Sequence, residues 1–125
     1  MTKKQKAVRR VYAARNATLR RIGFRSYQDY LNSDLWARIR AQQLEKSAYC
    51  YSCFCLATQV HHKSYRLNVL LGVDSSGLRS VCGSCHFNIE FDNNGTKRSV
   101  SRANRRLRHL RLSNKNKTTA MQNSA

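Results

Sequence analysis

Four cysteines stand in two identically spaced pairs, a pattern typical of a thiolate metal site. Cys50 and Cys53 form the first pair and Cys82 and Cys85 the second, giving the pattern C-x2-C-x28-C-x2-C. Each C-x-x-C unit can place two thiolates on one ion, and four thiolates suit the tetrahedral geometry of structural zinc. The spacing therefore predicts one structural Zn²⁺ that joins two distant parts of the chain. Cys55 falls outside the pattern and is expected to be a small apolar filler or an accessible thiol.

Three histidines and a glutamate indicate a second, open kind of metal site. His61 and His62 are adjacent near the end of an expected strand, where neighbouring side chains point to opposite faces. His86 and Glu90 are four residues apart on an expected helix and so share one face. Two histidines with one carboxylate leave coordination positions open for water and phosphate. Each of these residues alone would be interpreted as a solvated surface residue. Together, and between two cysteine pairs, they indicate a functional site.

The net charge of +18 is concentrated at the two ends of the chain. Residues 1–25 carry nine Lys and Arg, residues 93–125 carry nine more, and neither segment has an acid, whereas residues 26–92 are neutral overall. One such segment is often only solubilising, but two on a small domain predict a polyanionic partner. Nucleic acid is favoured because counterion release rewards scattered cations. The residues expected to contact phosphates are Lys3, Lys4, Arg9, Arg10, Arg20, Arg21, Arg102, Arg105, Arg106 and Arg108.

Length and composition narrow the class of protein. A chain of 125 residues is the size of one domain with a small core, for which a metal staple is reasonable. The sequence has no apolar run of about 18 residues, so no membrane partner is expected. The basic N-terminus lacks a following apolar stretch and argues against secretion, although it also suits an organelle transit peptide. An odd number of cysteines at ligand spacing favours a reducing intracellular compartment, the cytoplasm or nucleoid.

The clearest helix signal lies before the first cysteine pair. Ser33 suits a helix N-cap, and Leu31, Leu35 and Ile39 recur every four residues. This pattern predicts a helix that runs to about residue 46. Trp36 lies beside the apolar repeat and is assigned to the core rather than to base stacking.

The other segments complete a small α+β fold with basic helical arms. The expected divisions are a basic arm at 1–26, a core at 27–95, and a basic helix with a polar tail at 96–125. The further expected elements, in chain order, are a helix at 3–22, strands at 59–62 and 78–81 joined by a loop, a helix at about 84–92, a helix at about 100–112 and a disordered tail from 113.

The histidine and cysteine segments resemble a known family of metal-dependent nucleases. Residues 60–65 read V-H-H-K-S-Y, and residues 78–90 read L-R-S-V-C-G-S-C-H-F-N-I-E. They are similar to the motifs V-H-H-x-x-Y and L-C-x-x-C-H-x-x-I-[HE] of the HNH endonucleases, in the branch with a ββα-metal motif stapled by zinc knuckles. Residues 30–40 also resemble the helix that often precedes the first knuckle there. The resemblance covers about residues 27–92.

The resemblance implies a ββα-metal (HNH) motif and metal-dependent hydrolysis of phosphodiester bonds, in DNA rather than RNA. It implies that His62 is the general base that activates water. It also implies that His61, His86 and Glu90 hold one catalytic divalent ion, Mg²⁺, Mn²⁺, Ni²⁺ or Zn²⁺. Many relatives carry a histidine in place of the glutamate.

The sequence departs from the family pattern at one position. Gly77 aligns with the family's middle Asn or Asp, which orients the general-base histidine or helps to hold the loop. Ser76, Asp74 and Asn68 are the candidates to replace it.

Two other functions stay open at this stage. A zinc-stapled nucleic-acid-binding module, associated with RNA or the ribosome, shares the cysteines and the basic arms but does not need the histidine and glutamate set. An enzyme subunit that acts beside a larger nucleic-acid-processing partner is the other alternative.

Overall fold

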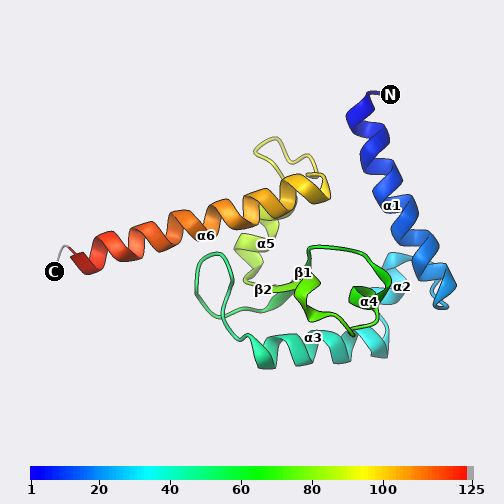
Figure 1. Cartoon of the computed structure of the whole chain (residues 1–125), viewed down its shortest axis with the longest axis horizontal. Helices are drawn as coiled ribbons and strands as arrows, with labels where there is room; N and C mark the ends of the chain where they lie inside the picture. Colours follow the sequence, from blue (N-terminus) through cyan, green and yellow to red (C-terminus); the bar gives the residue numbers. More distant parts are fainter. Residues whose placement is uncertain (124–125) are drawn as a thin grey trace.

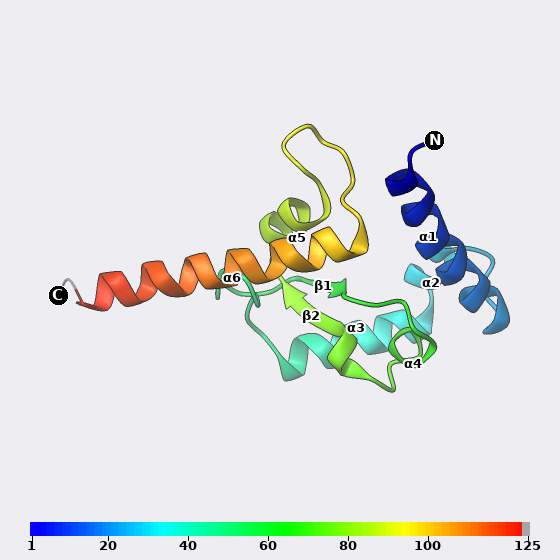
Figure 2. The ribbon, with the colours of Figure 1, turned by 45° about the horizontal axis from the view of Figure 1, so that its top comes forward.

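The computed structural model describes residues 1–123, with side chains as far as residue 117. The elements, in chain order, are α1 (Lys3–Arg21), α2 (Tyr27–Leu31), α3 (Asp34–Lys46), β1 (Gln59–His62), α4 (Leu67–Leu70), the 3-10 turn η1 (Ser75–Gly77), β2 (Leu78–Val81), α5 (Gly83–Glu90) and α6 (Val100–Asn123). Helix α3 covers one side of a two-stranded antiparallel sheet, and α5 with α6 lies on the other side (Figures 1 and 2). The expected small α+β class is confirmed.

Local capping explains the three N-terminal helices. Thr2 and Gln5 form a capping box at the start of α1, and Ser26 and Ser33 cap α2 and α3 with their hydroxyl groups. The predicted N-cap of α3 and its end at Lys46 are confirmed. Helix α1 matches its predicted range to within one residue. Helix α2 was not predicted because five residues are too few to show an apolar period.

Strands β1 and β2 lie where the sequence predicts them and pair with Val60 opposite Ser80 and His61 opposite Arg79. The sequence predicts a plain loop between them, and this prediction is wrong, because the connection contains α4 and η1. Val69 and Leu70 of α4 are buried in the core, so tertiary packing stabilises a helix that is too short to form alone.

The two C-terminal helices differ from their predicted ranges. Helix α5 ends at Glu90, about two residues early, because Phe91 has an extended backbone. Helix α6 continues to Asn123, so the prediction of a disordered tail from residue 113 is wrong as far as residue 123. No Gly or Pro interrupts this segment. Arg111 and Asn114 also donate to the backbone carbonyls of Tyr51 and Ser52, both at 2.7 Å, and hold the helix against the first cysteine pair.

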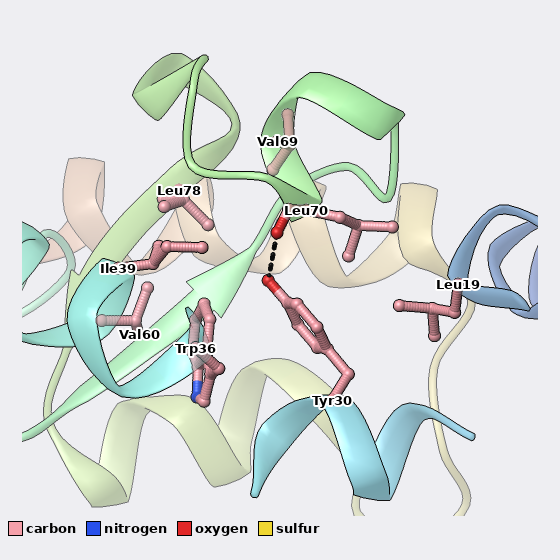
Figure 3. Close-up of a cluster of buried hydrophobic side chains, with 8 residues drawn as sticks. All are labelled: Leu19, Tyr30, Trp36, Ile39, Val60, Val69, Leu70 and Leu78. Carbon is pink, nitrogen blue, oxygen red and sulfur yellow. Dashed lines mark hydrogen bonds between the residues drawn. The ribbon is translucent and has the colours of Figure 1, made fainter. Parts of the chain in front are cut away.

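The larger core cluster joins α1, α2, α3, α4 and the sheet (Figure 3). Its buried residues are Leu19, Tyr30, Trp36, Ile39, Val60, Val69, Leu70 and Leu78. Tyr30 is fully buried and donates its hydroxyl hydrogen to the carbonyl of Leu70 at 2.8 Å, which satisfies its polar atom (Figure 3). The assignment of Trp36 to the core is confirmed, since the side chain is buried.

A second core cluster includes Cys50 and packs against the other three paired cysteines. It comprises Cys50, Val81, Ile89, Ala103 and Leu107, so α6 contributes two of its members. Leu19 of α1 belongs to the first cluster. Both basic ends of the chain therefore include side chains that pack in the interior.

Candidate functional site

The four paired cysteines meet at one place in the fold. Cys50 and Cys53 lie in the turn after α3, Cys82 is the N-cap of α5, and Cys85 lies in the first turn of that helix. The four sulfur atoms all lie within 4.8 Å of one another, close enough to bind one metal ion. The predicted grouping is confirmed.

The electrostatics of this cluster suit a cation. Burial raises the pKa of the Cys50 and Cys85 thiols above their ordinary value, so both are neutral at pH 7 without a positive partner. A bound metal ion would supply the charge that stabilises thiolates here. Cys55 is exposed, with its sulfur 3.0 Å from that of Cys53, which agrees with an accessible thiol.

The second group brings together His61 from β1 with His86 and Glu90 from α5. Their ligand atoms lie within 4.8 Å of one another. Glu90 Oε1 is 3.1 Å from His61 Nδ1 and 3.8 Å from His86 Nε2. Lys97 Nζ lies 4.0 Å from the other carboxylate oxygen. The register and the helix spacing therefore produce the predicted convergence.

The charges of this group also fit a divalent ion. Burial lowers the pKa of His86, so this imidazole is neutral at pH 7 and keeps a free lone pair. Burial alone would raise the pKa of Glu90, but the neighbouring His61 and His86 lower it below its ordinary value, so the carboxylate is ionised. His61 Nδ1 is buried and has no hydrogen-bond partner among the described residues, although the carboxylate is near. Imidazole nitrogens and a carboxylate oxygen are suitable ligands for such an ion.

Each of these histidines also contacts a carboxamide on its other ring nitrogen. His61 Nε2 lies 3.1 Å from Asn104 Oδ1, and Asn104 donates its Nδ2 hydrogen to the carbonyl of Lys63 at 2.9 Å. His86 Nδ1 lies 2.6 Å from Gln59 Oε1. The sequence analysis missed both amides because they belong to other elements and share no motif with the histidines.

His62 points to the other face of β1, as predicted for adjacent strand residues. Its Nδ1 atom lies 3.0 Å from the hydroxyl oxygen of Tyr27, and its ring stacks on Trp36 with 4.6 Å between centroids. Only 5% of the residue is exposed, and Nε2 has no partner in the described part of the chain. Burial, followed by the nearby His61 and His86, lowers the pKa of this imidazole to about 3.

The hydrogen bonds of the residues proposed to replace the family's middle Asn are local and do not reach His62 in the described part of the chain. Asp74 accepts a hydrogen bond from Ser76 and caps η1, and Asn68 accepts from the turn at residue 73 through its backbone. Gly77 itself has no room for a side chain, because a Cβ atom would lie 2.4 Å from a methyl carbon of Val69. The hydroxyl group of Tyr27 is the group that lies within hydrogen-bond distance of His62 Nδ1.

A cleft of about 340 Å³ connects the two faces of the site. Its lining includes His62, Tyr27, Trp36 and Tyr65 on the aromatic side and His86, Glu90, Lys97 and Arg40 on the polar side. The cleft places two cations beside the carboxylate and the histidines, an arrangement that suits an anionic ligand.

The basic residues of α1 and α6 lie on helices that extend away from the core (Figures 1 and 2). The cations predicted to contact phosphates are exposed or half-buried. Arg98, just before α6, and Arg102, Arg105, Arg106 and His109 of α6 line a hollow on the surface. Sequence reasoning missed Arg15, whose guanidinium lies 4.1 Å from the ring centre of Tyr27 and so stands near the cleft.

No family model, curated protein or solved structure matches this chain in the comparisons made with them. Between residues 1 and 123, none of the helices combines the length and the apolar character needed to cross a membrane.

Proposed function

We propose that the chain is a metal-dependent endonuclease of the HNH type that hydrolyses phosphodiester bonds in DNA. The observation that carries the proposal is the convergence of His61, His86 and Glu90 next to a cleft that His62 also lines. The order of β1, β2 and α5, strand, strand and helix, agrees with a ββα-metal motif. The preference for DNA rests on the family resemblance alone.

His61, His86 and Glu90 would hold one divalent ion, and the candidates are Mg²⁺, Mn²⁺, Ni²⁺ and Zn²⁺. Such an ion, when bound, stabilises the negative charge that develops on the phosphate and the leaving oxygen. Lys97 and Arg40 line the same cleft and attract the phosphate by charge.

His62 acts as the general base in this proposal. It is neutral at pH 7, and when Nδ1 donates its hydrogen to the Tyr27 oxygen, Nε2, the ring nitrogen without a partner, has a lone pair that can accept a proton from water. A phosphate that enters the cleft adds negative charge and raises the pKa of the imidazole towards the working pH. Because Nε2 is buried, the aromatic side chains of the cleft must shift for water to reach it.

The remaining parts of the chain have supporting roles. Cys50, Cys53, Cys82 and Cys85 bind a structural Zn²⁺ that fixes α5 to the turn after α3. The Lys and Arg residues of α1 and α6 bind phosphates that flank the cleavage site. These contacts raise the affinity for DNA but discriminate little between base sequences.

A plasmid-nicking assay tests the proposal. Purified protein is incubated with supercoiled plasmid, with and without chelator and with each of the four divalent ions added. We expect nicking that requires the added ion and is lost in His62→Ala by about 10²–10⁴-fold, with DNA affinity nearly unchanged. His109→Ala, at an exposed histidine of α6, is the matched control and keeps the activity. A wild-type protein that binds DNA and cleaves under none of these ions would contradict the proposal.

The burial of His62 favours a second candidate function, a zinc-stapled module that binds nucleic acid without cleaving it. In that case His62 is a core side chain stacked on Trp36, and its loss lowers stability rather than activity. The nicking assay separates the two functions, because a pure binding module leaves the plasmid intact with every ion.

A further inference from the structure

The contact between His61 and Asn104 determines which ring nitrogen carries the hydrogen. Asn104 donates its Nδ2 hydrogen to the carbonyl of Lys63, so the amide oxygen is the atom that faces the imidazole. A carbonyl oxygen only accepts hydrogen bonds. His61 Nε2 must therefore carry a hydrogen, and in the neutral ring Nδ1 has a lone pair.

That lone pair faces another acceptor. His61 Nδ1 lies 3.1 Å from Glu90 Oε1, and the buried nitrogen has no hydrogen-bond partner among the described residues. Two electron-rich atoms at this separation repel each other unless a positive charge stands between or beside them. The pair is therefore arranged for a shared cation.

His86 has the same kind of contacts as His61, with the roles of its two ring nitrogens exchanged. Its Nδ1 atom lies 2.6 Å from Gln59 Oε1, so Nδ1 carries the hydrogen and Nε2 has the lone pair. Nε2 is the atom that lies 3.8 Å from Glu90 Oε1. The two histidines thus use opposite ring nitrogens, and in both the free lone pair is on the side of the carboxylate.

We propose that Asn104 and Gln59 are positioning residues that fix the tautomers of His61 and His86 so that both free nitrogens converge on one divalent cation. This inference rests on the proposed function, because it assigns a metal to the same three residues. Outer hydrogen bonds of this kind orient metal-ligating histidines and raise their basicity.

The inference makes α6 part of the metal centre. Ala103 and Leu107 of α6 are buried in the second core cluster and hold the helix against α5. Asn104 lies between them in sequence and reaches β1 through His61. The basic helix that is expected to contact phosphates is therefore joined directly to a ligand of the ion.

Manganese binding tests the inference without any measurement of cleavage. The zinc-loaded protein is titrated with Mn²⁺, and free Mn²⁺ is measured by electron paramagnetic resonance. We expect wild-type protein to bind one equivalent. Asn104→Leu and Gln59→Leu remove the acceptor oxygen at similar volume and should each weaken Mn²⁺ binding about 10- to 100-fold. Asn104→Asp and Gln59→Glu keep an acceptor oxygen and should bind at least as tightly as wild type.

The controls separate this inference from the proposed function. Asn116→Ala, at an exposed asparagine on the same helix, should bind Mn²⁺ like wild type. Nitrogen-15 NMR of the folded protein without Mn²⁺ should show the hydrogen of His61 on Nε2, and Asn104→Leu should lose that preference. A wild type that binds no Mn²⁺ contradicts the metal site itself. A wild type that binds, with Asn104→Leu unchanged or Asn104→Asp as weak as Asn104→Leu, contradicts only the positioning role.

Discussion

His62 Nδ1 is held by the hydroxyl of Tyr27, a residue from a helix outside both metal-binding segments. Three other rings, those of Trp36, Tyr30 and Tyr65, surround the same imidazole. The pKa of Tyr27 is raised well above its usual range by burial, so this hydroxyl stays neutral and serves as a hydrogen-bond partner. At the scale of residues, the orientation of the candidate base thus depends on a neighbour that no motif includes.

Replacing Tyr27 with Phe should slow plasmid nicking through a lower kcat, with little change in KM, because the ring of His62 loses its orienting hydrogen bond. The variant should also lose about 1–3 kcal/mol of unfolding free energy, since Nδ1 is left buried without a partner. Urea unfolding and cleavage kinetics measure the two effects. Tyr49→Phe, at an exposed tyrosine, is the control. An equally active Tyr27→Phe protein would show that the hydroxyl does not position the base.

The pKa of His62 predicts a pH dependence of stability. The pKa is about 3 in the folded chain, against an ordinary value of 6.5, mainly because of burial. Between these values the unfolded chain binds one more proton than the folded chain, so the free energy of unfolding falls as the pH falls, by at most about 1.4 kcal/mol per pH unit. His62→Phe should lose less stability than wild type between pH 7 and pH 5 in urea unfolding. Equal losses in the two proteins would rule out the lowered pKa.

At the scale of elements, η1 packs against α4 through its last residue, Gly77. Gly77 has no positive φ in the structure, so packing rather than backbone conformation requires it. The methyl groups of Val69 occupy the space that a Cβ atom would need. This contact gives a physical reason why an Asn cannot stand at this position without movement of α4.

Gly77→Ala should lower the free energy of unfolding by about 1–3 kcal/mol, because the added methyl group overpacks the contact with Val69. Val69→Ala should relieve the overlap, so the double variant should be more stable than the sum of the single effects predicts. Chemical denaturation of the four proteins gives the coupling energy. Additive effects would mean that Val69 is not the obstacle.

The start of α5 depends on the cysteine cluster, since Cys82 is its N-cap and Cys85 lies in its first turn. Cys82→Ser should lose bound zinc and unfold the core, because metal binding at such sites contributes about 10 kcal/mol or more to folding. Elemental analysis should find near one zinc per wild-type chain, and circular dichroism reports the unfolding. Cys55→Ser removes an exposed thiol outside the four-cysteine group and should keep both metal and fold. Folded wild-type protein without metal would contradict the structural zinc.

At the scale of the whole molecule, the basic ends are continuous with the core. Leu19 of α1 is fully buried, and α6 contributes Ala103 and Leu107 to the second cluster. Removing the first helix would therefore damage the interior as well as the charge. Substitutions of exposed cations are the cleaner test of nucleic-acid binding.

Neutralising Lys3, Lys4, Arg9 and Arg10 to Gln should flatten the salt dependence of DNA affinity, because each lost phosphate contact reduces the slope of log K against log salt by about 0.9. Fluorescence anisotropy across salt concentrations measures the slope. Arg38→Gln, at an exposed arginine of α3, should leave the slope unchanged. An unchanged slope in the four-residue variant would mean that α1 does not contact DNA phosphates.

Much of the fold follows from local sequence signals. The C-x-x-C spacing predicts the four-sulfur cluster, and the two strands and the capped helix α3 appear within a residue or two of their predicted ranges. These features depend on spacing and capping over a few residues, which are encoded in consecutive positions. The i and i+4 spacing of His86 and Glu90 also placed both side chains on one face.

Only the tertiary structure determined the surroundings of those residues. Tyr27, Asn104 and Gln59 reach the three histidines from separate elements, at sequence separations of 27 to 43 residues. The length of α6 and the short helices α2 and α4 likewise depend on contacts with the core rather than on their own propensity. Long-range packing leaves no local pattern in the sequence, so the candidate ligand residues could be predicted while the side chains that contact their ring nitrogens could not.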